Sequence, residues 1–177
     1  MKFKATALWT AVAVGCGAMA SHAADPAREL ATLSHAKVSM NQAITVAEEQ
    51  GRGDAIDAEY VPKSGATGMY DVKVLSRDGK KLLDFNINPE NGRVLKATRE
   101  RAGKVFTRIK PADLQNAQTP LKGAVKTAEA QTGGKAVGAD TDRHGETVRY
   151  TVKVAMADGT TQTIKVNGAD GKVASAQ

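Results

Sequence analysis

Few side chains in this sequence have the types and spacing that catalysis requires. Beyond the first 23 residues there are two histidines, His35 and His144, far apart and outside HExxH or a similar metal-binding spacing. Ser39 and Ser64 lack the GxSxG setting of an activated serine and any obvious histidine partner. The single cysteine, Cys16, lies in the N-terminal apolar segment. We therefore expect no catalytic residue, no cofactor and no metal, and expect that the protein is not an enzyme.

One acidic stretch has part of a calcium-loop pattern. Residues 140–145, DTDRHG, place acids at positions one and three and glycine at position six. Position five is His144, however, and position twelve is Thr151, where a bidentate glutamate is required. We interpret this stretch as a polar hairpin loop.

A basic stretch lies near the middle of the chain. Residues 93–110, RVLKATRERAGKVFTRIK, contain one acid, Glu100. The basic residues there are Arg93, Lys96, Arg99, Arg101, Lys104, Arg108 and Lys110. We take Arg99, Arg101, Lys104 and Arg108 as candidate partner-binding residues, suited to an acidic protein surface or an anionic envelope polymer. The alternative is a solvated strand and linker whose apolar residues face the fold, namely Val94, Leu95, Val105 and Ile109.

Aromatic residues offer little for stacking nucleic acid bases. Those beyond the first 23 residues are Tyr60, Tyr70, Phe85, Phe106 and Tyr150, and several occupy predicted core positions. We therefore expect no nucleic acid partner. Tyr70 and Tyr150 fall at matched places in two similar halves of the chain, which is compatible with a shared site but favours an inward aromatic filling each core.

The N-terminus has the order of a secretory signal. Lys2 and Lys4 precede an apolar run, which ends in small residues before a cleavage site after Ala23. The alternative is a lipid anchor at Cys16, because AVGC resembles a lipobox with alanine in place of leucine. No stretch is long enough to be a transmembrane segment, so we expect a periplasmic or secreted protein. Cleavage would lower the formal net charge from +6 to +4, since only Lys2 and Lys4 are lost.

The rest of the chain is a duplication. Ala43, Ile44, Ala47 and Glu48 match Ala124, Val125, Ala128 and Glu129 at a constant offset. Further on, YDVKVLSRDG matches YTVKVAMADG, and FNINPENGRV matches IKVNGADGKV. The offset slips only in predicted turns, where exposed backbone tolerates length changes.

Each copy is predicted to be a helix followed by strands. Ser39 with Gln42 forms a capping-box pattern, and Thr119 before Pro120 suggests a hydroxyl cap for the second helix. Apolar residues recur at helical spacing from Met40 and again from Leu121. Paired glycines, Gly51 with Gly53 and Gly133 with Gly134, are expected to end the helices. Alternating apolar residues and Asp-Gly turns then predict antiparallel strands.

These patterns predict an α+β fold of two repeats, each with one helix packed on a three- to four-stranded antiparallel sheet. A unit of about 60 residues buries only about 60% of its unfolded surface, and this chain has no disulfide or metal to stabilise it. We therefore expect the two copies to pack against each other. The expected divisions are a signal peptide at 1–23, units at 38–97 and 119–175, and a basic connector at 98–118.

The segments AITVAEEQGRG, YDVKVLSRDG and FNINPENGRVL, with their second copies, resemble the PepSY domain. The resemblance implies a small exported module found in propeptides of thermolysin-like metallopeptidases and in free-standing envelope proteins, where it inhibits or regulates peptidases. The family has no catalytic residues to transfer. Asn88 and Asn91 stand where an acid is often seen, whereas the second copy has Asp170. We interpret all three as turn formers.

Two functions follow as hypotheses. The first is a non-catalytic exported PepSY-like protein that binds a protein partner such as a peptidase and inhibits or regulates it, for instance by strand addition at a sheet edge. The second is a structural or sensory envelope module that binds an anionic ligand through the basic connector.

Overall fold

The computed structural model describes residues 26–63, 66–101 and 109–176. The predicted signal at 1–23, Cys16, Ser64, Lys104, Val105, Phe106 and Arg108 therefore lie outside the described residues. The elements, in chain order, are α1 (Pro26–Leu33), α2 (Met40–Gly51), β1 (Gly53–Lys63), β2 (Ala66–Ser76), β3 (Lys81–Ile87), β4 (Val94–Arg101), α3 (Pro111–Gln115), α4 (Leu121–Thr132), β5 (Lys135–His144), β6 (Thr147–Ala155), β7 (Thr161–Asn167) and β8 (Val173–Ala176). Within these ranges, no helix is long and apolar enough to cross a membrane.

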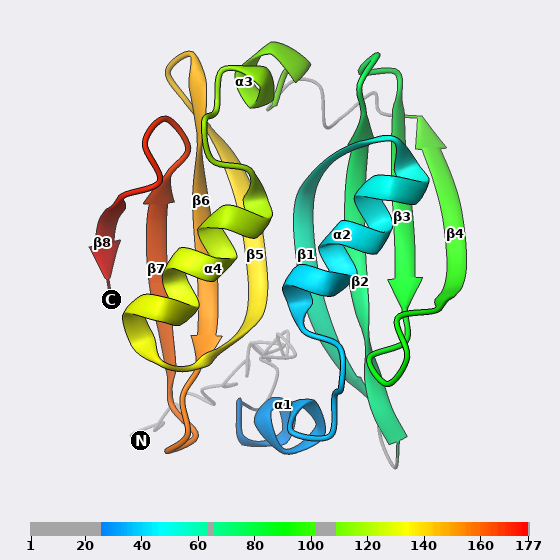
Figure 1. Ribbon diagram of the computed structural model, residues 1–177, viewed down its shortest axis with the longest axis vertical. Coiled ribbons are helices and arrows are strands. Elements are labelled where there is room, and N and C mark those ends of the chain that lie inside the picture. The colour runs from blue at the N-terminus through cyan, green and yellow to red at the C-terminus, as the bar shows by residue number, and fades with distance from the viewer. Residues whose placement is uncertain (1–25, 64–65, 102–108, 177) are drawn as a thin grey trace, which may run out of the picture.

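All strands join one antiparallel sheet with the order β4-β3-β2-β1-β5-β6-β7-β8. We call α1 to β4 the first unit and α3 to β8 the second unit. Each unit contributes four strands, and α2 and α4 lie on the same face of the sheet (Figure 1). The predicted α+β fold of two helix-plus-sheet units is therefore confirmed. The sequence did not predict that the two sheets would be continuous.

The units meet at the middle of the sheet. Strand β1 pairs with β5, so that Asp57 lies opposite Asp140 and Ala58 opposite Ala139. Helices α2 and α4 also contact each other above this seam. The two copies thus pack together as expected, through backbone pairing as well as side chains.

Each helix buries its apolar stripe against the strands beneath it. Met40, Ala43, Ile44 and Ala47 on α2 are all at most 2% exposed, and the matched stripe on α4 is buried equally. The facing strand residues are Tyr70, Val72, Val74, Phe85 and Ile87, and in the second unit Tyr150, Val152, Val154, Ile164 and Val166. Full burial of one such side chain contributes roughly 1.5–3 kcal/mol, so these layers supply the main stabilisation. Both tyrosines are therefore core residues, as favoured.

The capping box that begins α2 is confirmed. The Ser39 amide donates to Gln42 Oε1 at 2.8 Å, and the Gln42 amide donates to Ser39 Oγ at 3.3 Å. The predicted hydroxyl cap of α4 is wrong, because Pro120 itself takes the extended N-cap conformation and no side chain caps the helix. Thr119 lies one residue earlier, where its carbonyl accepts a hydrogen bond from the Tyr150 hydroxyl at 2.8 Å.

Glycine ends α4 as expected, whereas α2 ends in a different way. Gly51 is the last residue of α2, and a Cβ there would lie 2.8 Å from Val74 Cγ1. Its small size therefore allows the helix end to lie directly on β2. The left-handed position that follows belongs to Arg52, with φ 49°, whereas the second unit uses Gly133, with φ 73°.

Both units carry a β-bulge at the same place. The register shifts between Ala55 and Asp57 on β1, and between Ala136 and Gly138 on β5. Ile56 is buried, but Ala55 rather than Ile56 pairs with Val74. Simple alternation along the strand could not show this extra residue.

Two short helices lie at opposite ends of the seam (Figure 1). Helix α1 precedes α2 and contacts β1, β2 and also β6 of the other unit. Helix α3 precedes α4 and packs on β6, with Arg143 Nε 3.1 Å from the buried Asp113 carboxylate. The sequence analysis predicted neither helix, and α3 falls within the expected connector.

Candidate functional site

The sheet has two outer edges, formed by β4 and β8. Strand β4 pairs with β3 from Ile87 opposite Val94 to Lys81 opposite Arg101. Strand β8 is only four residues long and pairs with β7. Edge strands present backbone N–H and C=O groups that another strand can pair with, so these edges are natural places for a partner.

Strand β4 is open to solvent along most of its length. Lys96, Ala97, Thr98 and Arg99 are exposed, and Leu95 is 58% exposed. Leu95 was expected to face the fold under the linker interpretation, and this is wrong. A register shift between Asn86 and Ile87 makes Leu95 the extra residue of an edge bulge.

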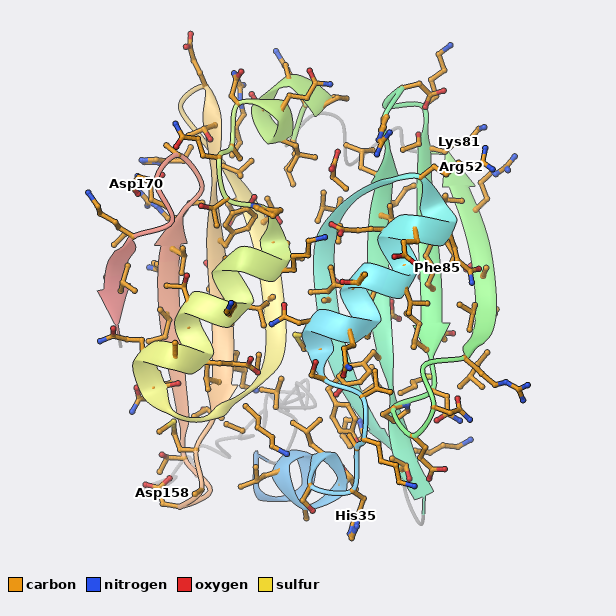
Figure 2. All side chains as sticks on the ribbon, in the orientation of Figure 1. His35, Arg52, Lys81, Phe85, Asp158 and Asp170 are labelled. Carbon is orange, nitrogen blue, oxygen red and sulfur yellow. The ribbon has the colours of Figure 1, made fainter. Side chains whose placement is uncertain are left out.

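Basic side chains gather around β4 at one end of the first unit. Arg99 lies opposite Leu83, which places it on the helix-covered side of the sheet, and the backbone of Arg101 pairs with that of Lys81. Arg52, which follows α2, lies at this same end. The next residue, Gly53, pairs with Ser76, and the Ser76 hydroxyl accepts a hydrogen bond from the Lys81 amide at 3.0 Å. Figure 2 labels Arg52 and Lys81 at this end. We call β4 with these two residues the basic edge.

The acidic residue at this end, Asp78, accepts hydrogen bonds within its own turn. Asp78 Oδ1 accepts from the Ser76 hydroxyl at 2.6 Å and from the Lys80 amide at 3.1 Å. These two hydrogen bonds hold the pKa of Asp78 below its usual value. Asp78 therefore stays ionised as a turn former, a role matched by Asp158 in the second unit.

Of the four predicted partner-binding residues, the structure describes Arg99 and Arg101. Arg99 is an exposed β4 residue, and Arg101 is the last residue of that strand. Lys104 and Arg108 lie outside the described residues. Ile109 is 4% exposed, so this end of the basic stretch is anchored in the core as the linker interpretation expected.

The matched edge of the second unit carries no charge. Lys96 of β4 corresponds to Ser175 of β8, and Leu95 corresponds to Ala174. The two copies therefore keep the same fold but differ at their outer strands. Charge on β4 is not a requirement of the fold, because β8 does without it.

The other polar candidates have structural roles. Residues 140–144 belong to strand β5 and are followed by a turn at Gly145, so this stretch lies in a hairpin as interpreted, but most of it is strand and not loop. His144 Nε2 lies 2.7 Å from an Arg149 guanidinium nitrogen, and His35 follows α1 in the other unit. Over the described ranges, no group of three or more His, Cys, Asp or Glu side chains could hold a metal ion.

The asparagines of the β3–β4 turn are turn formers, as interpreted. Asn88 Oδ1 accepts from the Glu90 amide at 2.7 Å, and Asn91 Oδ1 accepts from the Arg93 amide at 3.0 Å. In the second unit, Asp170 Oδ1 accepts from the Lys172 amide at 3.1 Å, in the same role as Asn91. An amide and a carboxylate serve equally here because each needs only to accept one hydrogen bond.

An acidic pair on the uncovered face of the sheet was missed. Asp71 on β2 lies near Asp84 on β3, and burial together with the Asp84 charge raises the pKa of Asp71 to about 6. Lys73, which lies beside them, forms an ion pair with Asp57 at 3.3 Å. The second unit has Thr151 in the place of Asp71, so this pair also belongs to one unit alone.

Comparison with known families confirms the resemblance seen in the sequence. The model of PepSY, the peptidase propeptide and YPEB domain, matches residues 37–98 and 120–176. The chain belongs to the PepSY family. These two PepSY matches coincide with the helix and four strands of each unit.

Comparison with solved structures finds a "putative lipoprotein" from Clostridium difficile 630, with a TM-score of 0.48 and 17% sequence identity. The similarity covers 80% of this PepSY chain and 93% of the other chain. No curated protein sequence matches the chain.

Proposed function

We propose that this tandem PepSY protein is a non-catalytic binding protein that regulates an exported peptidase by holding an extended segment of it at the basic edge. Its family description includes peptidase propeptides, which supports a peptidase as the partner. The observation that carries the proposal is the contrast between the long, basic, exposed β4 and the short, neutral β8.

Strand addition explains why no conspicuous side-chain motif is needed. A partner segment beside β4 would use main-chain hydrogen bonds for affinity, and each such bond contributes about 0.5–1.5 kcal/mol. Lys96 and Arg99 would select an acidic segment and repel another basic edge. The Leu95 bulge and these charges also hinder self-pairing of β4, which keeps the edge available for an unlike partner.

The location of this activity follows from the predicted signal. Cleavage after Ala23 would release the protein into a periplasm or the medium, where it would meet exported peptidases. Lipid attachment at Cys16 is the alternative route and would keep the protein at the membrane surface.

The test is inhibition of a secreted thermolysin-like metallopeptidase at near-stoichiometric ratio. The double substitution Lys96→Glu with Arg99→Glu should weaken inhibition by about tenfold or more, because it reverses the charge of the edge. Ser175→Glu on β8 is the matched control and should leave inhibition unchanged. Equal inhibition by the wild type and the double variant would refute the role of β4.

A second candidate function is supported by the basic residues that flank β4. Arg52 and Lys81 extend the positive charge from the edge strand onto the end of α2 and the β2–β3 hairpin. Such a surface suits an anionic envelope polymer, as a structural or sensory module would bind. Salt-sensitive retention on an anionic polymer, lost when Arg99, Arg101 and Lys104 are replaced by alanine, would support this function over peptidase regulation.

A further inference from the structure

A crevice of about 360 Å³ lies between the two units on the helix side of the sheet. The first unit contributes the segment that joins α1 to α2, and the second contributes the end of α4 and the start of β5. Its apolar wall includes Val38, Met40 and Ala136, and one carboxylate, Glu129, also lines it. Helix α1, whose last residue Leu33 lines the crevice, lies below the junction of the units in Figure 1.

The other copy shows what the matched carboxylate binds. Glu48 on α2 corresponds to Glu129 on α4, and each accepts from a backbone amide of the strand that follows its helix. The Ala55 amide donates to Glu48 Oε1 at 3.3 Å, and the Ala136 amide donates to Glu129 Oε1 at 3.0 Å. The second oxygen of Glu48 then accepts an ammonium, from Lys122 Nζ at 2.9 Å.

Glu129 has no such lysine on the facing helix. The residue that matches Lys122 is Asn41 of α2, whose side chain ends in a neutral carboxamide and has no ammonium group. The crevice therefore combines an apolar wall with a carboxylate whose counterpart in the other unit holds a lysine.

Tyr70 does not compete for this carboxylate. Its hydroxyl donates to the Val38 carbonyl at 2.7 Å. Burial raises the pKa of Tyr70 above its usual value, and the charges of Tyr60 and Glu129 add to this effect. Tyr70 thus stays neutral and Glu129 supplies the negative charge on this wall.

We propose that the crevice is a receptor for a lysine side chain of a partner protein, with the ammonium bound by Glu129 and the aliphatic stem packed along Val38, Met40 and Ala136. A lysine stem can bury its methylene groups while its head pairs with a carboxylate. Lys37 and Lys135 also line the crevice and are exposed, so the partner lysine should be flanked by acidic residues. The crevice contains no residue of β4, so this inference does not rest on the proposed function.

The test uses the peptide acetyl-Ala-Glu-Lys-Glu-Ala-amide and isothermal titration calorimetry on the protein. Binding should be saturable and weaken by about tenfold or more when the peptide lysine is Nε-acetylated, because the charge-assisted hydrogen bond is lost. Glu129→Gln should cause the same loss while retaining the acceptor for the Ala136 amide. No binding, or equal binding of the acetylated peptide, would overturn the proposal.

Two further variants separate the crevice from general effects of charge. Glu48→Gln removes the matched carboxylate, which lies outside the crevice, and should leave peptide binding intact. Asn41→Lys should place an ammonium from the protein itself at Glu129 and so block the peptide without unfolding the chain. Thermal melts check that all variants are folded, and a Glu48→Gln loss equal to that of Glu129→Gln would count against the crevice.

Discussion

The ammonium of Lys122 on α4 lies 2.9 Å from the carboxylate of Glu48 on α2, so an ion pair joins the helices of the two units. The Glu48 side chain is 14% exposed, whereas that of Lys122 is 43% exposed. Replacing Lys122 with methionine keeps much of the packing and leaves Glu48 partly buried without a cation. We expect the free energy of unfolding to fall by about 1 kcal/mol, measured by urea denaturation.

An increase in the free energy of unfolding is expected when the equivalent ion pair is built at Glu129 of α4. Asn41→Lys supplies the missing counterpart to Glu129 and should raise the free energy of unfolding by about 0.5 kcal/mol, less at high salt because exposed ion pairs are screened. Combining Asn41→Lys with Glu129→Gln should cancel the gain. A gain that survived Glu129→Gln would show that the two side chains do not meet.

Tyr70 and Tyr150 tie each helix to its sheet in the same way. The Tyr70 hydroxyl donates to the Val38 carbonyl at 2.7 Å, and the Tyr150 hydroxyl donates to the Thr119 carbonyl at 2.8 Å. Tyr70→Phe and Tyr150→Phe should each reduce the free energy of unfolding by about 1 kcal/mol, since one hydrogen bond is lost and the ring stays packed. The losses should add in the double variant, which chemical denaturation can measure, and no loss in either single variant would contradict this account.

Arg52 occupies a backbone conformation that favours glycine. With φ 49° it lies in the left-handed region, where a side chain adds steric cost. Arg52→Gly should therefore raise the melting temperature and stabilise the protein by about 0.5–1 kcal/mol. The matched change Gly133→Ala should destabilise the protein by a similar amount. Calorimetry of both variants compares the two equivalent positions within the same protein.

Asp71 gives stability a pH dependence of predictable sign. Its pKa of about 6 lies above the value of an unfolded aspartate, so the folded state binds the proton more tightly. Its contribution is complete below about pH 4 and is lost as the pH rises through about 6. Asp71→Asn should therefore stabilise the protein at pH 7.5 and give no gain at pH 4.

We expect Asp71→Asn to raise the free energy of unfolding at pH 7.5 by about 1 kcal/mol. The gain is limited because water screens this partly exposed carboxyl and because Lys73, Asp57 and Asp84 also act on it. Thermal melts at the two pH values measure the effect. A constant effect of Asp71→Asn at both pH values would contradict the assignment.

Local patterns predicted the elements of each unit well. The helical spacing from Met40, the Ser39 capping box and the alternation from Tyr70 all depend on neighbours within a few residues, and all are present in the structure. The duplication itself strengthened these predictions, because each copy served as a check on the other.

The features that were missed depend on residues distant in sequence. The β1–β5 pairing, the ion pair of Glu48 with Lys122 and the crevice at Glu129 arise only when the units meet. The bulges at Ile56 and Leu95 were missed because a strand with one extra residue contains the same types of residue as a regular strand. Comparing Lys122 with Asn41 at matched positions was the signal that could have pointed to the crevice.

The β1–β5 seam joins equivalent strands of two copies in antiparallel fashion, with α2 and α4 on one side. Identical subunits in a closed dimer meet through the same two-fold arrangement, where every substitution appears twice. A covalent tandem is free of that constraint. Here one unit can change its sequence while the other unit keeps the fold stable. The matched positions Arg52/Gly133, Asp71/Thr151 and Lys96/Ser175 differ between the units in this way.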